Sequence, residues 1–301
     1  MASPVSPDAT HSSGTDRHTW AAHKQRRSYA RNMCSPSATL TAWAGAWLAG
    51  RGAPDDVLDS LHAWAPRQLV AAGDPVTGGH TGLPWPGGES LGRGGAGIML
   101  LLKLIREESD DPRARLRLML PVPGDVRGLP TGSEFAAAAL EAQEGILVGV
   151  PGGDGMGLVP EWVDEQTLQW TVYRTPVPQV AEQDMALGEA EYAIRQAVRD
   201  AADALAHLQT TAVNSGGPDP RELIEDELAE YARHEYPESI PLRARRILDT
   251  ADHVAAILTV AQHEPASAPS SASAMAAQET LLRPLWNAIR AARLAAIHAT
   301  V

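Results

Sequence analysis

The chain contains one cysteine, Cys34, among its 301 residues, so an intrachain disulfide is excluded. Chains of this size without disulfides are typical of reducing compartments. Long apolar runs are missing as well: a stretch such as Ile98–Leu102 is far too short to cross a bilayer. The first residues also lack the hydrophobic stretch of a signal peptide. We therefore expect a cytoplasmic protein that does not enter a membrane.

Positive charge is scarce. The chain has 25 Lys and Arg against 37 Asp and Glu, which gives a net charge of −12. The segment from Ala181 to Ile240 alone holds 14 acidic and 4 basic residues, a net charge of −10. Nucleic-acid binders show the opposite balance, with basic residues gathered on the binding face. We expect no nucleic-acid partner.

Metal-binding and cofactor patterns are missing from the sequence, although it has 10 histidines. It contains neither H-E-x-x-H nor the paired E-x-x-H repeats of di-iron bundles. The best local cluster is Asp249, Asp252 and His253. Because Asp249 and His253 are four residues apart on one helical face, this cluster favours a structural hydrogen bond over a set of metal ligands. We assign no metal and no cofactor.

The pattern of the chain divides it into three regions. Residues 1–37 are polar and lack periodicity, which predicts a disordered head. Residues 38–180 mix helical and strand patterns, and residues 181–301 are helical throughout. The predicted fold class is α+β: a small mixed, partly parallel three-stranded sheet with packed helices, followed by an α-helical bundle. A Pro- and Ser-rich segment at 265–273 predicts a flexible linker within the bundle.

The first half of the α/β region predicts helices and a long loop. Leu40, Trp43, Trp47 and Leu48 recur at helical spacing, and a second helix follows Pro54, so we expect a helical hairpin. Residues 72–97 are rich in Gly and Pro and predict a loop. It contains the patterns G-E-S-L-G (88–92) and G-R-G-G-A-G (92–97), which resemble a nucleophile elbow and a dinucleotide fingerprint. Neither follows the strand that its chemistry requires, so we assign no site to either.

The second half predicts the sheet. Residues 98–108 form a largely apolar helix, and residues 115–120 alternate between apolar and polar, as a strand does. A helix starting at Ser133, with a capping-box pattern from Thr131 to Glu134, leads to a short strand at 146–150. We expect residues 115–150 to be a β-α-β unit with parallel strands and a right-handed crossover. A third strand is predicted at 168–173.

The helical region predicts an antiparallel four-helix bundle. Its first helix carries an apolar stripe over residues 187–212, about three heptads long, that must pair with another helix. Asp219 and Pro220 predict the start of a second helix, Ser239 and Pro241 that of a third. A fourth covers residues 282–296.

The loop at 121–133 is the best candidate site. It follows the carboxyl end of a strand and enters a helix at Ser133, the place where α/β proteins bind anions. Arg127 offers a positive charge, and Asp125 offers a carboxylate that is a base, a metal ligand or only an Asx-turn residue. The alternative is that P-V-P-G-D (121–125) is simply a rigid turn.

Two functions remain open. The first is a non-catalytic interaction or regulatory module that binds another protein, or a second copy, through the stripe at 187–212. The second is an anion-binding or enzymatic α/β domain that uses Asp125, Arg127 and Ser133. Because the loop offers only two charged side chains, a catalytic constellation is incomplete, and we favour the first.

Three segments resemble an uncharacterised actinobacterial protein family: LPVPGDVRGLP (120–130), FAAAALEAQEGILV (135–148) and GLVP (157–160). The resemblance covers about residues 98–215. The single Phe, beside 26 Gly and 23 Pro, agrees with GC-rich coding DNA. The resemblance implies a source and attaches no activity.

Overall fold

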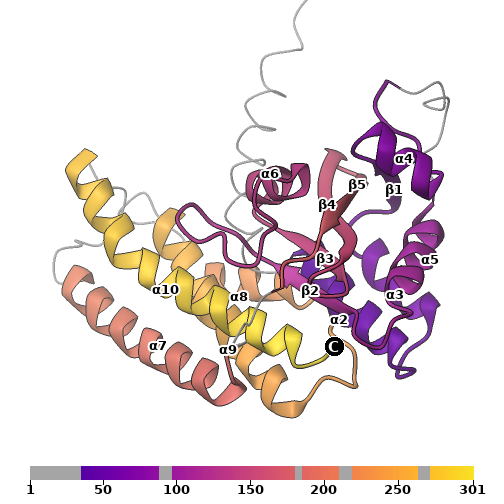
Figure 1. Cartoon of the computed structure of the whole chain (residues 1–301). Coiled ribbons are helices and arrows are strands. Elements are labelled where there is room, and N and C mark those ends of the chain that lie inside the picture. The colour runs from indigo at the N-terminus through magenta and orange to yellow at the C-terminus, as the bar shows by residue number, and fades with distance from the viewer. Residues whose placement is uncertain (1–34, 88–96, 180–184, 210–218, 264–271) are drawn as a thin grey trace, which may run out of the picture.

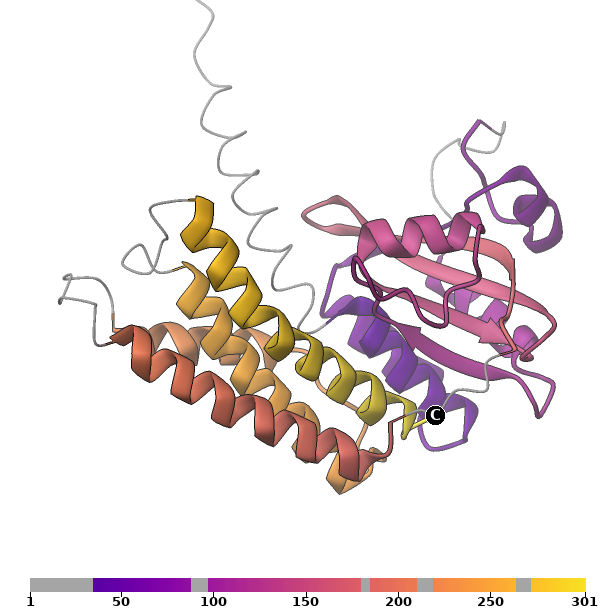
Figure 2. The ribbon, with the colours of Figure 1, turned by 60° about the vertical axis from the view of Figure 1, so that its left-hand side comes forward.

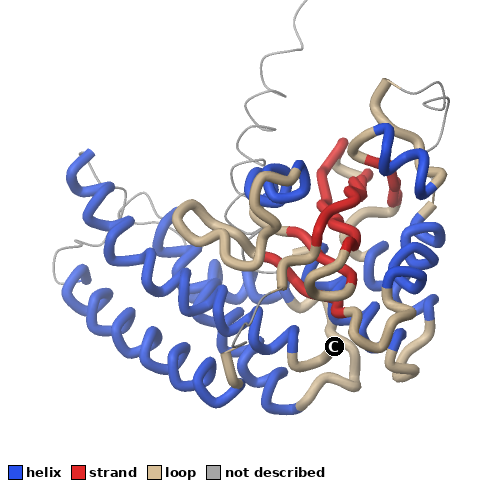
Figure 3. The backbone as a smooth tube through the Cα atoms, in the orientation of Figure 1, coloured by secondary structure: helices blue, strands red, loops and turns tan. Residues whose placement is uncertain are grey.

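The computed structural model describes residues 35–87, 97–179, 185–209, 219–263 and 272–301 (Figure 1). Most of the predicted head and linker therefore lies outside the described residues. A mixed sheet with flanking helices forms one side of the molecule, and long helices form the other (Figures 1 and 2). Helices and strands are both present, as predicted, and Figure 3 shows how they divide between the two sides.

The sheet has five strands in the order β1-β5-β4-β3-β2. Their bounds are β1 (Arg67–Ala72), β2 (Arg115–Met119), β3 (Gly145–Gly149), β4 (Asp154–Asp164) and β5 (Thr167–Pro176). The prediction of three strands was wrong because β1 and β4 were missed. Strand β1 is short and ends in two alanines, and β4 contains Gly155, Gly157 and Pro160, which are rare in strands.

The predicted parallel β-α-β unit at 115–150 was also wrong. Strands β2 and β3 are antiparallel neighbours, and Met119, the end of β2, lies opposite Gly145, the start of β3. The loop and helix between β2 and β3 therefore begin and end at the same edge of the sheet. A parallel crossover would have to return to the opposite end. The sheet is nevertheless partly parallel, because β1 pairs with β5 in parallel.

Five helices accompany the sheet in the described residues: α2 (Pro36–Leu48), α3 (Pro54–His62), α4 (Pro75–Thr81), α5 (Ile98–Glu108) and α6 (Glu134–Ala142). Helix α4 lies within the segment 72–97 that was predicted as a loop. Helix α2 is buried on nearly all sides over its first ten residues. Its Leu40 and Ala44 pack into the core of the sheet, whereas Ala38 and Ala42 pack into the core of the bundle. A helix that is apolar all round belongs between two layers, which is where α2 lies.

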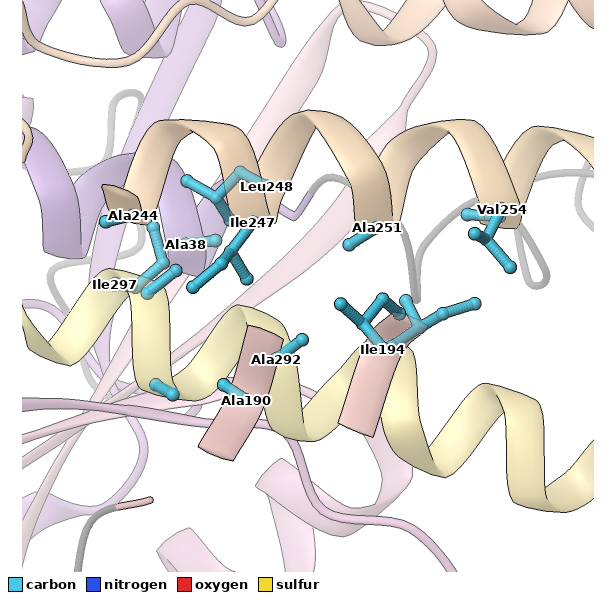
Figure 4. Packing of buried hydrophobic residues seen from close by; sticks show 14 of the residues in the cluster. Ala38, Ala190, Ile194, Ala244, Ile247, Leu248, Ala251, Val254, Ala292 and Ile297 are labelled. Carbon is cyan, nitrogen blue, oxygen red and sulfur yellow. The ribbon is translucent and has the colours of Figure 1, made fainter. Parts of the chain in front are cut away.

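The bundle consists of α7 (Leu187–Gln209), α8 (Pro220–Tyr231), α9 (Leu242–His263) and α10 (Ala272–His298). Helix α10 packs against both α7 and α9. Ala190 and Ile194 of the predicted stripe are buried facing α9 and α10, beside Ala251 and Ala292 (Figure 4). Small alanines at these positions let the helices approach closely, so the first part of the stripe is used inside the bundle.

Helix α10 also covers an edge of the sheet. Strand β2 is an edge strand, so one side of its backbone has no neighbouring strand. The His298 ring Nε2 lies 3.2 Å from the Leu118 carbonyl oxygen, and Arg290 Nη1 donates to the Leu120 carbonyl oxygen at 3.0 Å. Side chains of the last helix thus satisfy carbonyls that an open edge would expose, and this protects the edge from pairing with another chain.

Candidate functional site

The predicted loop at 121–133 lies where the sheet meets the bundle. Its first residues form a tight turn: Asp125 N donates to the Val122 carbonyl oxygen at 2.9 Å, and Val122 N donates to the Asp125 carbonyl oxygen at 3.1 Å. Gly124 has a φ of 89°, which a residue with a side chain adopts only with strain. The P-V-P-G-D sequence is therefore a rigid turn, and it fixes the position of Asp125.

Asp125 is the centre of a three-residue ion cluster. Arg127 donates to it twice, from Nε to Oδ1 at 2.8 Å and from Nη2 to Oδ2 at 2.9 Å. Arg290 of α10 donates to the same Oδ2 through Nη2, and its Nη1 bonds to the Leu120 carbonyl oxygen. Arg290 therefore binds the side chain of the loop and the backbone that precedes it, so the cluster joins the sheet layer to the bundle.

The three side chains differ in exposure. Arg127 is 86% exposed, whereas Asp125 and Arg290 are only 20% and 16% exposed. Charge-assisted hydrogen bonds from Arg127, and then from Arg290, hold the pKa of Asp125 far below its usual range, although partial burial opposes the shift. The carboxylate is therefore ionised at neutral pH and a poor proton acceptor.

A small pocket opens beside the cluster. It is lined by Leu120, Val122, Trp286, Asn287 and Arg290 and encloses about 40 Å³. This volume accommodates roughly three water molecules, so it suits one small polar group of a ligand and is too small for a whole metabolite. Arg290 Nε is buried without a hydrogen-bond partner, so this guanidinium retains an unsatisfied donor.

Exposed residues of the loop follow Asp125, the residue that binds Arg290 of the pocket. Val126 is 50% exposed, Arg127 extends into solvent, and Trp286 and Val122 are half-buried. We call Val122, Val126, Arg127, Trp286 and Arg290 together the junction face. It combines an aromatic ring, aliphatic groups and two cations.

Ser133 serves the helix start and does not complete an anion site. Its hydroxyl accepts a hydrogen bond from Ala136 N at 3.1 Å and donates to the Pro130 carbonyl oxygen at 2.9 Å. Ser133 is thus the N-cap of α6, in place of Thr131 in the predicted capping box. The structure brings Asp125 and Arg127 together, while the hydroxyl of Ser133 is used in these local hydrogen bonds.

Sequence reasoning missed Arg290 and Trp286, which lie four residues apart on α10 and therefore on one face. The apolar stripe predicted there identified the buried side of the helix. It contained no signal that the flanking Arg290 pairs with a residue 165 positions earlier.

The structure separates the three side chains of the Asp249, Asp252 and His253 cluster. Asp249 and His253 are exposed, whereas Asp252 turns inward and pairs with Arg293 of α10, whose side chain is 4% exposed. Burial raises the pKa of Asp252, and Arg293 opposes this shift. Within the described ranges, no group of three or more His, Cys, Asp or Glu side chains is placed to hold a metal. The pattern at 88–92 lies outside those ranges. The pattern at 92–97 also lies outside them, except for its last residue, Gly97.

None of the helices in the part of the chain that the structure describes has both the length and the apolar character needed to cross a membrane.

Two family models match the chain. "Rv1486c-like protein, N-terminal domain" matches residues 37–184, and "Rv1486c-like protein, C-terminal domain" matches residues 188–294. The division between the two models falls where the sheet layer ends and α7 begins.

Similar proteins occur in mycobacteria. "Uncharacterized protein ML1804" of Mycobacterium leprae (strain TN) is 40% identical over 297 residues, which cover 89% of this chain and 97% of the relative. "Uncharacterized protein Rv1486c" of Mycobacterium tuberculosis (strain ATCC 25618 / H37Rv) is 42% identical over 292 residues, with the same coverage. No solved structure matches the chain. The resemblance to an actinobacterial family, predicted from the segments between residues 120 and 160, is confirmed.

Proposed function

This chain belongs to the Rv1486c-like protein family, and we propose that it is a cytoplasmic, non-catalytic protein-interaction module that binds its partner through the junction face. The observation that carries this proposal is the composition of that face. Trp and Arg are the residues most enriched at the energetic centres of protein interfaces. Here Trp286 and Arg290 lie four residues apart on one helix and line the same pocket, and the exposed Arg127 binds the same carboxylate, that of Asp125, as Arg290 does.

The electrostatics of Asp125 support a non-catalytic role. A general base needs a pKa near the working pH, whereas hydrogen bonds from Arg127 and Arg290 lower the pKa of Asp125 and occupy its oxygens. The cluster is better suited to hold surfaces together than to transfer a proton.

The stripe at 187–212 was the first candidate for the partner surface. Ala190 and Ile194 are buried within the bundle, which leaves the junction face as the more accessible choice. The partner is another protein or a second copy of this chain.

Site-specific photocrosslinking tests the proposal. A benzoylphenylalanine at Val126 lies on the junction face, and one at Val163, which is 54% exposed on β4, is a matched control because Val126 is 50% exposed. In extract of the source cells, we expect a discrete protein adduct from position 126 that Trp286→Ala abolishes. Equal crosslinking from both positions, or none from position 126, contradicts the proposal.

The alternative is a small anionic ligand, and Arg290 in the pocket lining favours it. Thermal shift against nucleotides, phosphosugars and acyl-CoAs tests it. Stabilisation that Arg127→Ala or Arg290→Ala removes would support this function, and a flat panel would count against it.

A further inference from the structure

The outer surface of the bundle exposes two large apolar side chains where α7 and α9 begin. Tyr192 of α7 is 67% exposed, and Leu242 in the first turn of α9 is 73% exposed. Each is next in sequence to one member of the ion pair that joins the two helices, in which Arg243 Nη2 lies 2.8 Å from Glu191 Oε2. Helix α7 lies on the side of the bundle away from the sheet (Figures 1 and 2). The sheet layer therefore leaves this surface accessible.

Arginines accompany the two apolar side chains. Arg195 and Arg199 follow Tyr192 at spacings of three and four residues, and all three are exposed, so they lie on one face of α7. The first five residues of α9, Leu242–Arg246, contain three arginines and no acidic residue. Tyr and Arg are enriched in protein interfaces. We call the following residues the basic side: Tyr192, Arg195, Arg199, Leu242, Arg243 and Arg246.

Helix α8 carries the opposite charge. It holds five acidic residues and one arginine, and its apolar residues Ile224 and Leu228 pack against the bundle core. Helix α9 packs against both α7 and α8, so oppositely charged surfaces occur on neighbouring helices of one bundle. The exposed acidic residues of α8, which we call the acidic side, are Glu222, Glu225, Asp226 and Glu230.

The charges of both sides are poorly placed for the helices that carry them. A helix dipole disfavours cations at the N-terminus, yet Arg243 and Arg246 lie at the start of α9, whose first turn has no acidic residue. The dipole disfavours anions at the C-terminus, yet the acidic residues of α8 continue into its last turn, which has no basic residue. Charges that do not stabilise their own helix are expected where they serve an interaction.

We propose that the basic side of one chain binds the acidic side of a second copy, and that the acidic side of the first binds the basic side of the second. A symmetric dimer requires this reciprocity, because each surface patch must find its complement on an identical chain. The contact would cover Tyr192 and Leu242. The proposal goes beyond the proposed function, since these two sides share no residue with the junction face.

The charge of the whole chain selects this orientation. Each copy has a net charge of −12, so two copies repel each other unless opposite charges meet. At about 0.15 M salt the Debye length is about 8 Å, which screens the long-range repulsion and leaves contacts between adjacent side chains. At about 1 M salt it is about 3 Å, so these contacts are screened as well, and we expect the Kd of the dimer to rise about tenfold.

Charge reversal with rescue tests the pairing by sedimentation velocity. One variant combines Arg199→Glu with Arg246→Glu, and the other combines Glu222→Arg with Asp226→Arg. Each variant alone should have a dimer Kd raised at least about tenfold, because like charges then face each other at both contacts. An equimolar mixture should form the dimer again, because the reversed residues of one chain meet the reversed residues of the other.

A matched control separates local pairing from net charge. Arg113→Glu combined with Arg115→Glu changes the net charge as much as the reversal of the basic side does. Both residues are exposed beside β2, away from the two sides. This variant should dimerise like the wild type.

Crosslinking between two copies provides a second measurement. A chain with benzoylphenylalanine at Tyr192 is mixed with isotope-labelled wild type, irradiated and digested with trypsin. The peptide Glu222–Arg233 lies between two trypsin sites and contains the whole acidic side. We expect position 192 to crosslink to the labelled form of this peptide.

Four results would overturn the inference: a wild type that is monomeric at both salt concentrations, a mixture of the two variants that stays monomeric, a control variant that loses the dimer, or no labelled adduct within 222–233. Crosslinking from Val126 reports on the junction face separately. Failure of either proposal is therefore distinguishable from failure of the other.

Discussion

Arg290 on the last helix and Asp125 in the loop after β2 form an ion pair across 165 residues of sequence. Both side chains are largely buried, and the guanidinium of Arg290 also donates a hydrogen bond to the Leu120 carbonyl oxygen. This contact between one loop and one helix adds to the packing of α2 and α10 that joins the sheet layer to the bundle. The pair therefore matters for the stability of the junction as well as for any ligand there.

Arg290 and Arg127 bind the same carboxylate but should contribute very differently to stability. Replacing Arg290 with alanine leaves Asp125 and the Leu120 carbonyl without a largely buried donor and should cost about 2–4 kcal/mol in the free energy of unfolding. Arg127 is exposed, so water replaces its hydrogen bonds, and Arg127→Ala should cost less than about 1 kcal/mol. Urea unfolding of both variants measures the difference. Equal losses would show that burial of Arg290 is unimportant.

Replacing only one residue of the buried pair Asp252 and Arg293 should destabilise the protein much more than replacing both. Arg293→Met leaves an unpaired carboxylate between α9 and α10, and breaking such a pair costs about 3–5 kcal/mol. Adding Asp252→Leu removes that charge and should restore the free energy of unfolding to within about 1–2 kcal/mol of the wild type. Chemical unfolding of the two single variants and the double variant measures this. A double variant as unstable as the worse single one would contradict the prediction.

The stacked pair of Trp64 and His234 should make the stability of the protein depend on pH. The two rings are parallel, with centroids 3.5 Å apart, and burial, with the nearby charge of Arg233, lowers the pKa of His234 from 6.5 to about 4. Between these values the unfolded chain binds a proton that the folded protein excludes, so stability falls as the pH drops through this window. We expect a loss of about 1 kcal/mol between about pH 7 and about pH 5, discounted for partial exposure.

His234→Phe keeps the stacked ring and removes the titration, so it should flatten this part of the pH profile. His253→Gln, at an exposed position on α9, is the control and should leave the profile unchanged. The prediction fails if His234→Phe retains the full dependence on pH.

Gly157 in β4 should not tolerate a side chain. A Cβ there would lie 2.2 Å from Cδ2 of Phe135, whose ring from α6 is fully buried against the sheet. Gly157→Ala should therefore destabilise the protein by about 1–3 kcal/mol through overpacking. Gly79 in α4 has no atom within 4 Å of its Cβ position, so Gly79→Ala should be neutral or stabilise by about 0.5–1 kcal/mol. Thermal unfolding of the two variants tests the contrast, and equal effects would contradict it.

Local patterns predicted local structure well. The apolar run bounded by Gly97 and Asp110 predicted a helix at 98–108, and α5 has these bounds. The alternation from Arg115 onward predicted β2 to within one residue. Strand β4 was missed because its glycines leave room for distant groups, the ring of Phe135 at Gly157 and the backbone of Val148 at Gly155, and this requirement is not visible in the local pattern. Strand direction was missed for a related reason: the direction in which the chain returns depends on tertiary packing.

The candidate site was predictable in part. Asp125 and Arg127 are two residues apart in a turn rich in Pro and Gly, so their proximity follows from the local sequence. Ser133 was correctly placed at a helix start, but that position also explains why its hydroxyl is used for capping. Arg290 decides the electrostatics of the loop, and a contact of this sequence separation leaves no periodic signal in a single chain.

A double-mutant cycle between Asp125 and Arg290 measures how strongly this pair joins the sheet layer to the bundle. The free energies of unfolding of the wild type, Asp125→Asn, Arg290→Gln and the double variant give the coupling between the two side chains. Because the pair is largely buried and charge-assisted, we predict a coupling of about 1.5–3 kcal/mol. A coupling below about 0.5 kcal/mol would mean that the two residues act independently and that their ion pair does not hold the loop to α10.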